Sequence, residues 1–375
     1  MPALLPDVDP DGLMEFSVVF TDRSLNHMSQ SFQGVLRDIS STLKEVYNAD
    51  AVALVPGGGT YAMEAVARQL VAGQTAMVIR NGWFSFRWSQ IFAAASLVSE
   101  EHVLKARQTG NDAQAPFAPA PIDEVVAEIK SKAPAVVFAP HVETASGMIL
   151  PDDYLRAVAD AVHSVGGLFV LDCIASGCIW VDMKAVGVDV LISAPQKGWS
   201  ASPSAGLVMM NSVAVARVEE TTSSSFAIDL KKWLSIMQAY ENGGHAYHAT
   251  MPTDALRKFR DIMNETKELG FERLRDAQWE LGDRVRALLA ARGIKSVAAE
   301  GFGAPGVVVS YTNDPGLQNG SKFAAQGLQI AAGVPLQCDE PADYSTFRLG
   351  LFGLDKLVDV DAAIARLEVA LDAVL

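Results

Sequence analysis

Short apolar runs alternate with longer amphipathic segments between residues 50 and 211. This alternation is typical of repeated β-α-β units around a mainly parallel sheet. We expect strands at Ala51–Val55, Ala76–Arg80, Leu97–Ser99, Ala135–Ala139, Leu168–Leu171, Val190–Ser193 and Gly206–Met210. We expect helices at Ala62–Ala72, Ile122–Lys132 and Asp152–Val165. The pattern therefore predicts an α/β core.

The pattern changes near residue 253. Apolar positions keep helical spacing from Thr253 through Arg292, and Gly270 is a candidate break. Further elements are expected at Gly306–Tyr311, Ser321–Ala332, Thr346–Gly350 and Val360–Leu371. We therefore predict an N-terminal segment and large domain over residues 1–255, and an interdomain helix and small α+β domain over residues 256–375. Thr109–Pro121, rich in Ala, Pro, Gln and Asn, is expected to be a surface loop.

Composition and charge narrow the class of protein. The chain has 375 residues, of which 50% are hydrophobic and 20% charged, as in soluble globular proteins of more than one domain. A net charge of −14 argues against nucleic acid as a partner. No apolar run approaches the roughly 20 residues of a membrane span, and the N-terminus is acidic, so we predict a cytoplasmic protein. Three cysteines without a CxxC pair, and histidines without HExxH spacing, predict neither disulfides nor a zinc site.

A glycine-rich stretch, Pro56-Gly57-Gly58-Gly59-Thr60, joins the first expected strand to the first expected helix. Ligands of open α/β sheets bind at the carboxyl ends of the strands. Glycines let the backbone approach an oxyanion, and a helix N-terminus attracts it, so the stretch suits a phosphate. An ordinary tight turn would account for the same residues.

Two ionisable residues also follow expected strands. Asp172 follows directly after the expected strand Leu168–Leu171. A partly buried carboxylate there needs a positive partner such as a protonated pyridine nitrogen. A helix N-cap or a structural ion pair would be an alternative. Lys197 follows Val190–Ser193, and lysine forms Schiff bases when its amine is desolvated. The alternative for Lys197 is an exposed, solvated side chain.

Taken in chain order, these residues resemble the alanine-glyoxylate and serine-pyruvate branch of the class V, fold-type I aminotransferases, which depend on pyridoxal 5'-phosphate. The resemblance lies in the glycine loop, Asn81-Gly82-Trp83-Phe84, Glu143-Thr144-Ala145-Ser146-Gly147, Asp172, Gln196-Lys197, Tyr247-His248-Ala249-Thr250-Met251-Pro252 and Thr346-Phe347-Arg348-Leu349-Gly350. It covers about residues 50 to 355. It implies a large domain with a mainly parallel seven-stranded sheet and a small C-terminal α+β domain.

The resemblance also implies roles for single residues. Lys197 would be the catalytic Schiff-base lysine, and Asp172 would face the pyridine nitrogen of pyridoxal phosphate. The other cofactor contacts would be Phe84 stacked on the ring, Thr144 near the 3'-oxygen, and Gly58, Gly59, Thr60 and Gln196 at the phosphate. Tyr247 and Thr250 would reach the phosphate from the second subunit of a homodimer. Arg348 would bind the substrate's α-carboxylate, unless it forms an ordinary surface ion pair.

The chain departs from the usual pattern of the branch at three places. The common Pro-Gly-Pro segment is not evident before Asn26-His27-Met28-Ser29, Ser85 stands where many members have glycine, and Ala145-Ser146 replaces Ser-Thr. Because the N-terminal segment often lines the substrate pocket of such enzymes, these changes bear on the substrate more than on the cofactor. No role is assigned to His248.

The resemblance implies an aminotransferase with a ping-pong mechanism. It would move the amino group of a small amino acid, such as alanine or serine, to a 2-oxo acid such as glyoxylate or pyruvate. One alternative is a lyase of the same fold, similar to cysteine desulfurases, with Cys338 as the nucleophile; the adjacent Asp339 and Glu340 would raise the pKa of that thiol and weaken it. Two further alternatives are a 2-aminoethylphosphonate transaminase and a non-catalytic α/β binding protein.

Overall fold

A computed structural model describes residues 13, 16–18, 20–21 and 23–375. The acidic terminus and most of the predicted N-terminal segment before residue 23 lie outside these residues. Within the described part of the chain, none of the helices combines the length and apolar character that a membrane crossing needs.

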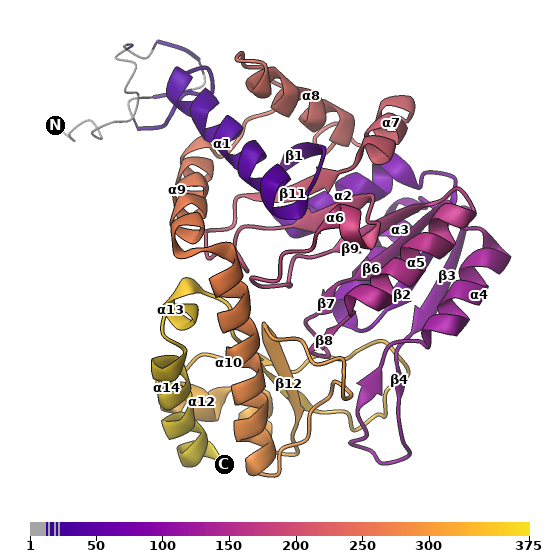
Figure 1. Cartoon of the computed structure of the whole chain (residues 1–375), viewed down its shortest axis with the longest axis vertical. Helices are drawn as coiled ribbons and strands as arrows, with labels where there is room; N and C mark the ends of the chain where they lie inside the picture. Colours follow the sequence, from indigo (N-terminus) through magenta and orange to yellow (C-terminus); the bar gives the residue numbers. More distant parts are fainter. Residues whose placement is uncertain (1–12, 14–15, 19, 22) are drawn as a thin grey trace.

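A seven-stranded sheet forms the centre of the larger part of the molecule (Figure 1). Its strands are β1 (Ala51–Pro56), β2 (Thr75–Arg80), β3 (Glu100–Lys105), β6 (Val136–Pro140), β9 (Leu168–Asp172), β10 (Val190–Ser193) and β11 (Ala205–Met210), in the spatial order β1-β11-β10-β9-β6-β2-β3. Strand β11 runs antiparallel to both of its neighbours, and the other adjacent pairs are parallel. The predicted mainly parallel sheet is confirmed.

Helices surround this sheet. They are α1 (Gln30–Tyr47), α2 (Gly59–Leu70), α3 (Trp83–Ala95), α4 (Ile122–Lys132), α5 (Asp152–Ser164), α6 (Met183–Val186), α7 (Ser212–Glu220) and α8 (Leu230–Glu241). Every residue of β6, β9, β10 and β11 is buried. Strands buried on both faces read as continuous apolar runs, which is why the sequence shows them so plainly.

The C-terminal part begins with two consecutive helices, α9 (Thr253–Leu269) and α10 (Phe271–Ala291). Gly270 lies between them with φ 95°, a conformation that glycine adopts readily, so the predicted break is confirmed. Beyond α10 lies an antiparallel sheet of β12 (Val307–Tyr311), β14 (Thr346–Gly350) and β13 (Ala331–Ala332), with the helices α11 (Pro315–Gln318), α12 (Ser321–Ala325), α13 (Leu354–Leu357) and α14 (Val360–Val374). Figure 1 shows α10 running beside α14 and β12.

Buried apolar side chains form three clusters. The largest fills the space around the seven-stranded sheet and includes Phe259 and Met263 of α9, and a second lies among α10, α14 and the small sheet. The third joins the two parts, because Val142 and Met148 of the large part pack there with Val307 and others of β12. The small sheet therefore packs against Val142 and Met148 of the large part. A domain boundary at residues 255 and 256 stays a prediction.

Three expected segments are wrong in whole or in part. The strand predicted at Leu97–Ser99 begins three residues later, at β3, because an edge strand with a polar side lacks a continuous apolar run. The helix predicted at Ser321–Ala332 ends at Ala325, and Gly327 follows with φ 76°. Part of the loop predicted at Thr109–Pro121 is buried.

Several short elements were not predicted. Strand β5 (Phe117–Ala118) pairs with β4 (Arg107–Gln108), and the Phe117 side chain is buried in the third cluster. Two further strands, β7 (Val142–Glu143) and β8 (Met148–Ile149), form a hairpin after β6. The turn of this hairpin contains Thr144, one of the predicted cofactor contacts.

Candidate active site

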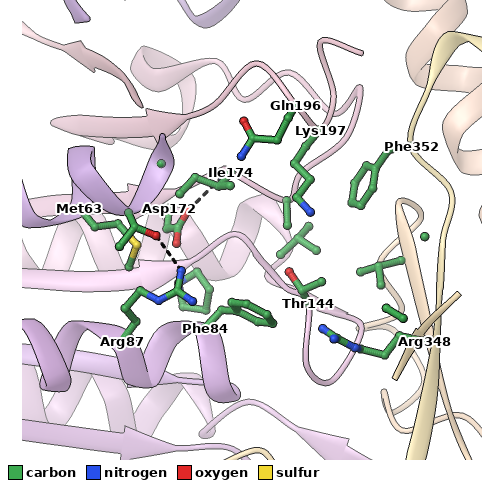
Figure 2. Close-up of a pocket in the computed structure, with 18 residues that line it drawn as sticks. Met63, Phe84, Arg87, Thr144, Asp172, Ile174, Gln196, Lys197, Arg348 and Phe352 are labelled. Carbon is green, nitrogen blue, oxygen red and sulfur yellow. Dashed lines mark hydrogen bonds between the residues drawn. The ribbon is translucent and has the colours of Figure 1, made fainter. Parts of the chain in front are cut away.

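A cavity of about 390 Å³ lies at the carboxyl ends of the parallel strands, between the large sheet and strand β14 (Figure 2). Six of the predicted cofactor contacts line it: Gly59, Thr60, Phe84, Thr144, Asp172 and Gln196. Lys197 and Arg348 line it too. Eight residues chosen from separate strand ends and loops therefore meet in one cavity, as expected for an open α/β sheet.

The glycine loop joins β1 to the N-terminus of α2. Gly57 has φ 123°, and a Cβ at Gly59 would lie 2.3 Å from Cδ1 of Ile174, so neither position tolerates a side chain without movement. The N-cap, Gly58, offers no side chain to the first amides of the helix. The N–H of Tyr61 donates to the carbonyl oxygen of Gly58, whereas Gly59 and Thr60, the first two residues of the helix, line the cavity. The loop is thus suited to bind an anion.

Asp172 is the last residue of β9 and only 7% of its surface is exposed. Its Oδ1 accepts a hydrogen bond of 2.9 Å from the backbone N–H of Ile174. Burial raises the pKa of the carboxyl to about 7, and this hydrogen bond opposes the shift. Among the described residues Asp172 forms no salt bridge, so the structure does not support the ion pair considered as an alternative. A buried carboxyl without a cation fits a site whose cation arrives with a ligand.

The raised pKa makes a prediction for the cofactor-free protein. Between pH 4 and 7 the unfolded chain loses the Asp172 proton while the folded chain retains it, so Asp172 lowers the free energy of unfolding as the pH rises. The free energy of unfolding of Asp172→Asn, relative to that of wild type, should therefore rise over this pH range by up to about 4 kcal/mol. Above pH 7 this difference should stay constant. Urea unfolding at several pH values measures the difference. A difference that does not vary with pH would contradict the burial argument.

The turn after β10 carries Gln196 and Lys197 and is held firmly. A Cβ at Gly198 would lie 2.0 Å from the carbonyl oxygen of Gly177, so only glycine permits this close approach. Trp199 is fully buried, and its ring packs against Trp180 at a centroid distance of 4.7 Å. Such packing fixes the backbone from which the Lys197 side chain reaches into the cavity.

The environment of Lys197 favours a reactive amine. Its Nζ lies 5.5 Å from the centre of the Phe352 ring. Burial and the positive charge of Arg348 lower the pKa of Lys197, so more of the amine is neutral at a given pH. A neutral amine is the form that acts as nucleophile or base.

Arg348 faces Lys197 from the small sheet. Its Nε donates a 2.8 Å hydrogen bond to the carbonyl oxygen of Ala332, and its Cζ lies 5.6 Å from the centre of the Phe84 ring. Burial lowers the pKa of Arg348, although the guanidinium stays charged near neutral pH. No carboxylate of the described chain forms a salt bridge with it, which excludes an ordinary surface ion pair within these residues. The fork of the guanidinium suits a carboxylate ligand.

Glu143 belongs to the motif Glu143–Gly147, and the sequence predicted no role for it. Its buried carboxylate accepts backbone N–H bonds from Phe84 at 3.2 Å, Ser85 at 2.8 Å and Ala145 at 3.0 Å, and the Ser85 hydroxyl donates at 2.7 Å. It thereby fixes the start of α3 against the turn that carries Thr144. The sequence feature that accompanies this contact is Gly82. A Cβ at this position would lie 2.7 Å from Cγ of Glu143, so the glycine leaves room for the Glu143 side chain.

The remaining predicted contacts lie elsewhere. Gly58 caps α2 but does not line the cavity. Tyr247 is 56% exposed, and its hydroxyl lies 3.2 Å from Oγ1 of Thr250, outside the cavity of this chain. His248 contacts the carbonyl oxygen of Phe226. Contributions of Tyr247 and Thr250 to a second subunit stay a prediction.

The sequence is similar to those of known aminotransferases. The family described as class V aminotransferases matches residues 14–301. The chain is 28% identical to 2-aminoethylphosphonate–pyruvate transaminase from Syntrophobacter fumaroxidans over 340 residues, which is 86% of this chain and 84% of the relative. It is 22% identical to alanine–glyoxylate aminotransferase 1 from Saccharomyces cerevisiae, with 78% of each chain covered.

The fold is likewise shared with solved structures. Pyridoxamine–pyruvate aminotransferase from Mesorhizobium loti superimposes with a TM-score of 0.77 at 16% identity, covering 93% of this chain and 86% of the other. At that identity the likeness shows the fold only, and it agrees with the α/β architecture expected from the sequence. The family match extends over most of the chain. The protein therefore belongs to the class V aminotransferase family.

Proposed function

We propose that the protein is a pyridoxal phosphate-dependent aminotransferase that moves the amino group of a small amino acid, such as alanine or serine, to a 2-oxo acid such as glyoxylate or pyruvate. The observation that carries this proposal is the meeting of Lys197, Asp172 and Arg348 in one cavity. A half-buried amine, a buried carboxyl and a guanidinium that forms no salt bridge with the described residues are the groups that such a reaction would use. The family match supports the same activity.

The residues present fit the cofactor. Asp172 is a buried carboxyl that forms no salt bridge with the described residues and would face the ring nitrogen. The side-chain oxygen of Gln196 is buried without a hydrogen-bond partner, and Figure 2 shows its amide group beside the cavity. Gln196 and the glycine loop would hold the phosphate, Phe84 would stack on the ring, and Thr144 would lie near the 3'-oxygen.

Lys197 and Arg348 would then act on the substrate. Bound pyridoxal phosphate supplies an electron sink for the charge that develops on the substrate's α-carbon. Lys197 would hold the cofactor through Nζ and, once the substrate amine has taken that place, would take the α-proton as general base. Arg348 would hold the α-carboxylate and so orient the α-carbon towards Nζ. The same residues would act in reverse on the 2-oxo acid, which gives ping-pong kinetics.

We further propose a homodimer in the cytoplasm. Tyr247 and Thr250 are exposed and adjacent, and in a dimer they would complete the phosphate site of the other subunit. Sedimentation of the protein tests for the dimer. Mixed dimers test whether each site is built from both subunits. A dimer of one Lys197→Ala subunit and one Tyr247→Ala subunit should have one working site of two, because that site combines the intact Lys197 with the intact Tyr247.

A panel of amino donors tests the proposed reaction. The cofactor-loaded protein is mixed with alanine, serine, aspartate or 2-aminoethylphosphonate, and the change in its visible spectrum is followed over a single turnover. Glyoxylate or pyruvate should then restore the first spectrum. Alanine or serine should react fastest. A faster reaction with 2-aminoethylphosphonate would instead support the activity named for the relative from S. fumaroxidans, which is the second candidate.

A desulfurase activity through Cys338 is not favoured. The Cys338 thiol is buried, its Sγ lies 3.3 Å from the carbonyl oxygen of Arg80, and it does not line the cavity. Burial, together with Glu143 and Glu340, raises the pKa of the thiol to about 12. We expect Cys338→Ala to keep transaminase turnover within about twofold of wild type, since the thiol is inert. Release of sulfide from cysteine by wild type, and its loss in Cys338→Ala, would reverse this assignment.

A further inference from the structure

Arg87 lines the same cavity, and the family resemblance gave it no role. It lies one helical turn after Phe84 on α3. Its Nη1 donates a 3.0 Å hydrogen bond to Oγ1 of Thr60, in the first turn of α2, and its Cζ lies 5.2 Å from the centre of the Phe84 ring. Figure 2 shows its guanidinium between Phe84 and Asp172. Arg87 therefore places a positive charge beside the glycine loop.

This charge forms no salt bridge in the described part of the protein. None of the salt bridges between described residues includes Arg87, although its side chain is half-buried. Asp172 is the carboxyl that lines the cavity, and Arg87 affects its pKa only weakly compared with burial. A half-buried guanidinium that lines a cavity and forms no salt bridge with the described residues is available to an anionic ligand.

The cavity has two cationic ends, separated by one aromatic ring. The guanidinium carbons of Arg87 and Arg348 lie 5.2 and 5.6 Å from the centre of the Phe84 ring. Arg348 comes from the small sheet and Arg87 from α3, next to the glycine loop. Two separate anions can therefore be bound, one at each end. If the substrate carboxylate lies at Arg348, the other end is left for a second anion.

The glycine loop supplies backbone N–H groups and the Thr60 hydroxyl, but no cation, to an anion at the start of α2. We propose that Arg87 is the cation that binds the phosphate of pyridoxal phosphate, jointly with Thr60. This inference rests on the proposed function. The bond to Thr60 holds the guanidinium beside the start of α2, where the phosphate would bind.

Two other roles of Arg87 make different predictions. If Arg87 only packs on Phe84, its charge is dispensable. If Arg87 only keeps Asp172 ionised, it affects the contact with the ring nitrogen of the cofactor. The affinity for pyridoxal, which lacks the phosphate, should then depend on Arg87 as much as the affinity for pyridoxal phosphate does. Only a role at the phosphate predicts that loss of the Arg87 charge weakens the binding of pyridoxal phosphate and not that of pyridoxal.

The experiment compares two ligands in three proteins. Cofactor-free, full-length wild type, Arg87→Met and Arg87→Lys are titrated with pyridoxal phosphate and with pyridoxal, and dissociation constants are read from protein fluorescence. Methionine keeps an apolar stem over Phe84 and removes the charge. Inorganic phosphate is added as a competitor in a parallel series. Arg156→Met, which removes an exposed arginine of α5, is the control and should match wild type.

In Arg87→Met, the dissociation constant for pyridoxal phosphate should rise about 10- to 100-fold, as loss of a charge-assisted bond implies. The constant for pyridoxal should stay within about twofold, which also shows that the variant folds. Arg87→Lys should retain part of the affinity. Inorganic phosphate should compete with pyridoxal phosphate in wild type and much less in Arg87→Met.

Other outcomes overturn the inference in distinguishable ways. Unchanged affinity for pyridoxal phosphate in Arg87→Met would mean that Arg87 only packs on Phe84. Equal losses for both ligands would place its effect at Asp172. If wild type binds neither ligand, the proposed function fails and the assignment of Arg87 fails with it. If wild type binds pyridoxal phosphate firmly and Arg87→Met shows no selective loss of that affinity, the assignment of Arg87 is wrong. The proposed function is then unaffected.

Discussion

Substitution of Lys197 by alanine should lower turnover at least about 10⁴-fold, because it removes both the covalent attachment and the general base. The purified variant should also lack the visible absorbance of the bound, covalently held cofactor. Lys197 is the lysine of the cavity, and the pKa of its amine is lowered by burial and by Arg348. Single-turnover spectra with alanine, with and without added methylamine, provide the measurement.

A surface lysine supplies the control for this result. Lys184 forms an exposed salt bridge with Asp50, and Lys184→Ala should keep the absorbance and turnover of wild type. Circular dichroism of Lys197→Ala should show an intact fold, since the turn that carries residue 197 is fixed by Gly198 and Trp199. If Lys197→Ala keeps its absorbance and its turnover, the assignment of the lysine is wrong. A wild-type protein that stays colourless with added pyridoxal phosphate would favour a non-catalytic binding protein.

The large sheet was predictable because its central strands are buried on both faces. Residues Val136–Pro140 and Leu168–Asp172 are wholly buried, and their sequences are correspondingly apolar. The edge strand Glu100–Lys105 has no fully buried residue, so its apolar pattern is weak and its position was missed. The same reasoning applies to Ala331–Ala332, whose two exposed alanines become a strand only through pairing with β14. Tertiary pairing, not local pattern, decides such segments.

The meeting of the candidate residues in one cavity was largely predictable because ligand-binding residues of an open sheet follow its strands. Asp172 ends the buried strand β9, Lys197 lies in the turn after the buried strand β10, and both line the cavity. Arg348 could be placed only through the family resemblance, since it comes from a different sheet far along the chain. Its approach to Phe84 depends on the packing of the two parts against each other, which no local pattern reveals.

The residues that were missed act through contacts over long separations in sequence. Glu143 binds the backbone of Phe84 and Ser85, and it is recognisable only when the two loops are seen together. Arg87 looks like one of many surface cations of a helix until Thr60 is found beside it. Phe352 lies two residues after β14 and reaches Lys197 only once the small sheet is in place.

Replacement of Arg348 by lysine should weaken the reaction with every donor that carries an α-carboxylate. Lysine keeps the positive charge but loses the planar fork that forms two parallel bonds. We expect kcat/KM for the preferred donor to fall about 10²-fold in Arg348→Lys and about 10³-fold in Arg348→Ala. The affinity for pyridoxal phosphate should change little, because Arg348 lies at the end of the cavity away from the glycine loop.

Two controls separate recognition of the carboxylate from a general loss of structure. Arg284→Lys alters a surface arginine that pairs with Glu280 and Asp361, and it should behave as wild type. Within Arg348→Lys, pre-steady-state kinetics should show weaker donor binding, together with slower proton removal because the α-carbon is less well oriented towards Lys197. A large loss of cofactor affinity in Arg348→Lys would instead place this arginine at the phosphate, which would exchange its role with the one proposed for Arg87.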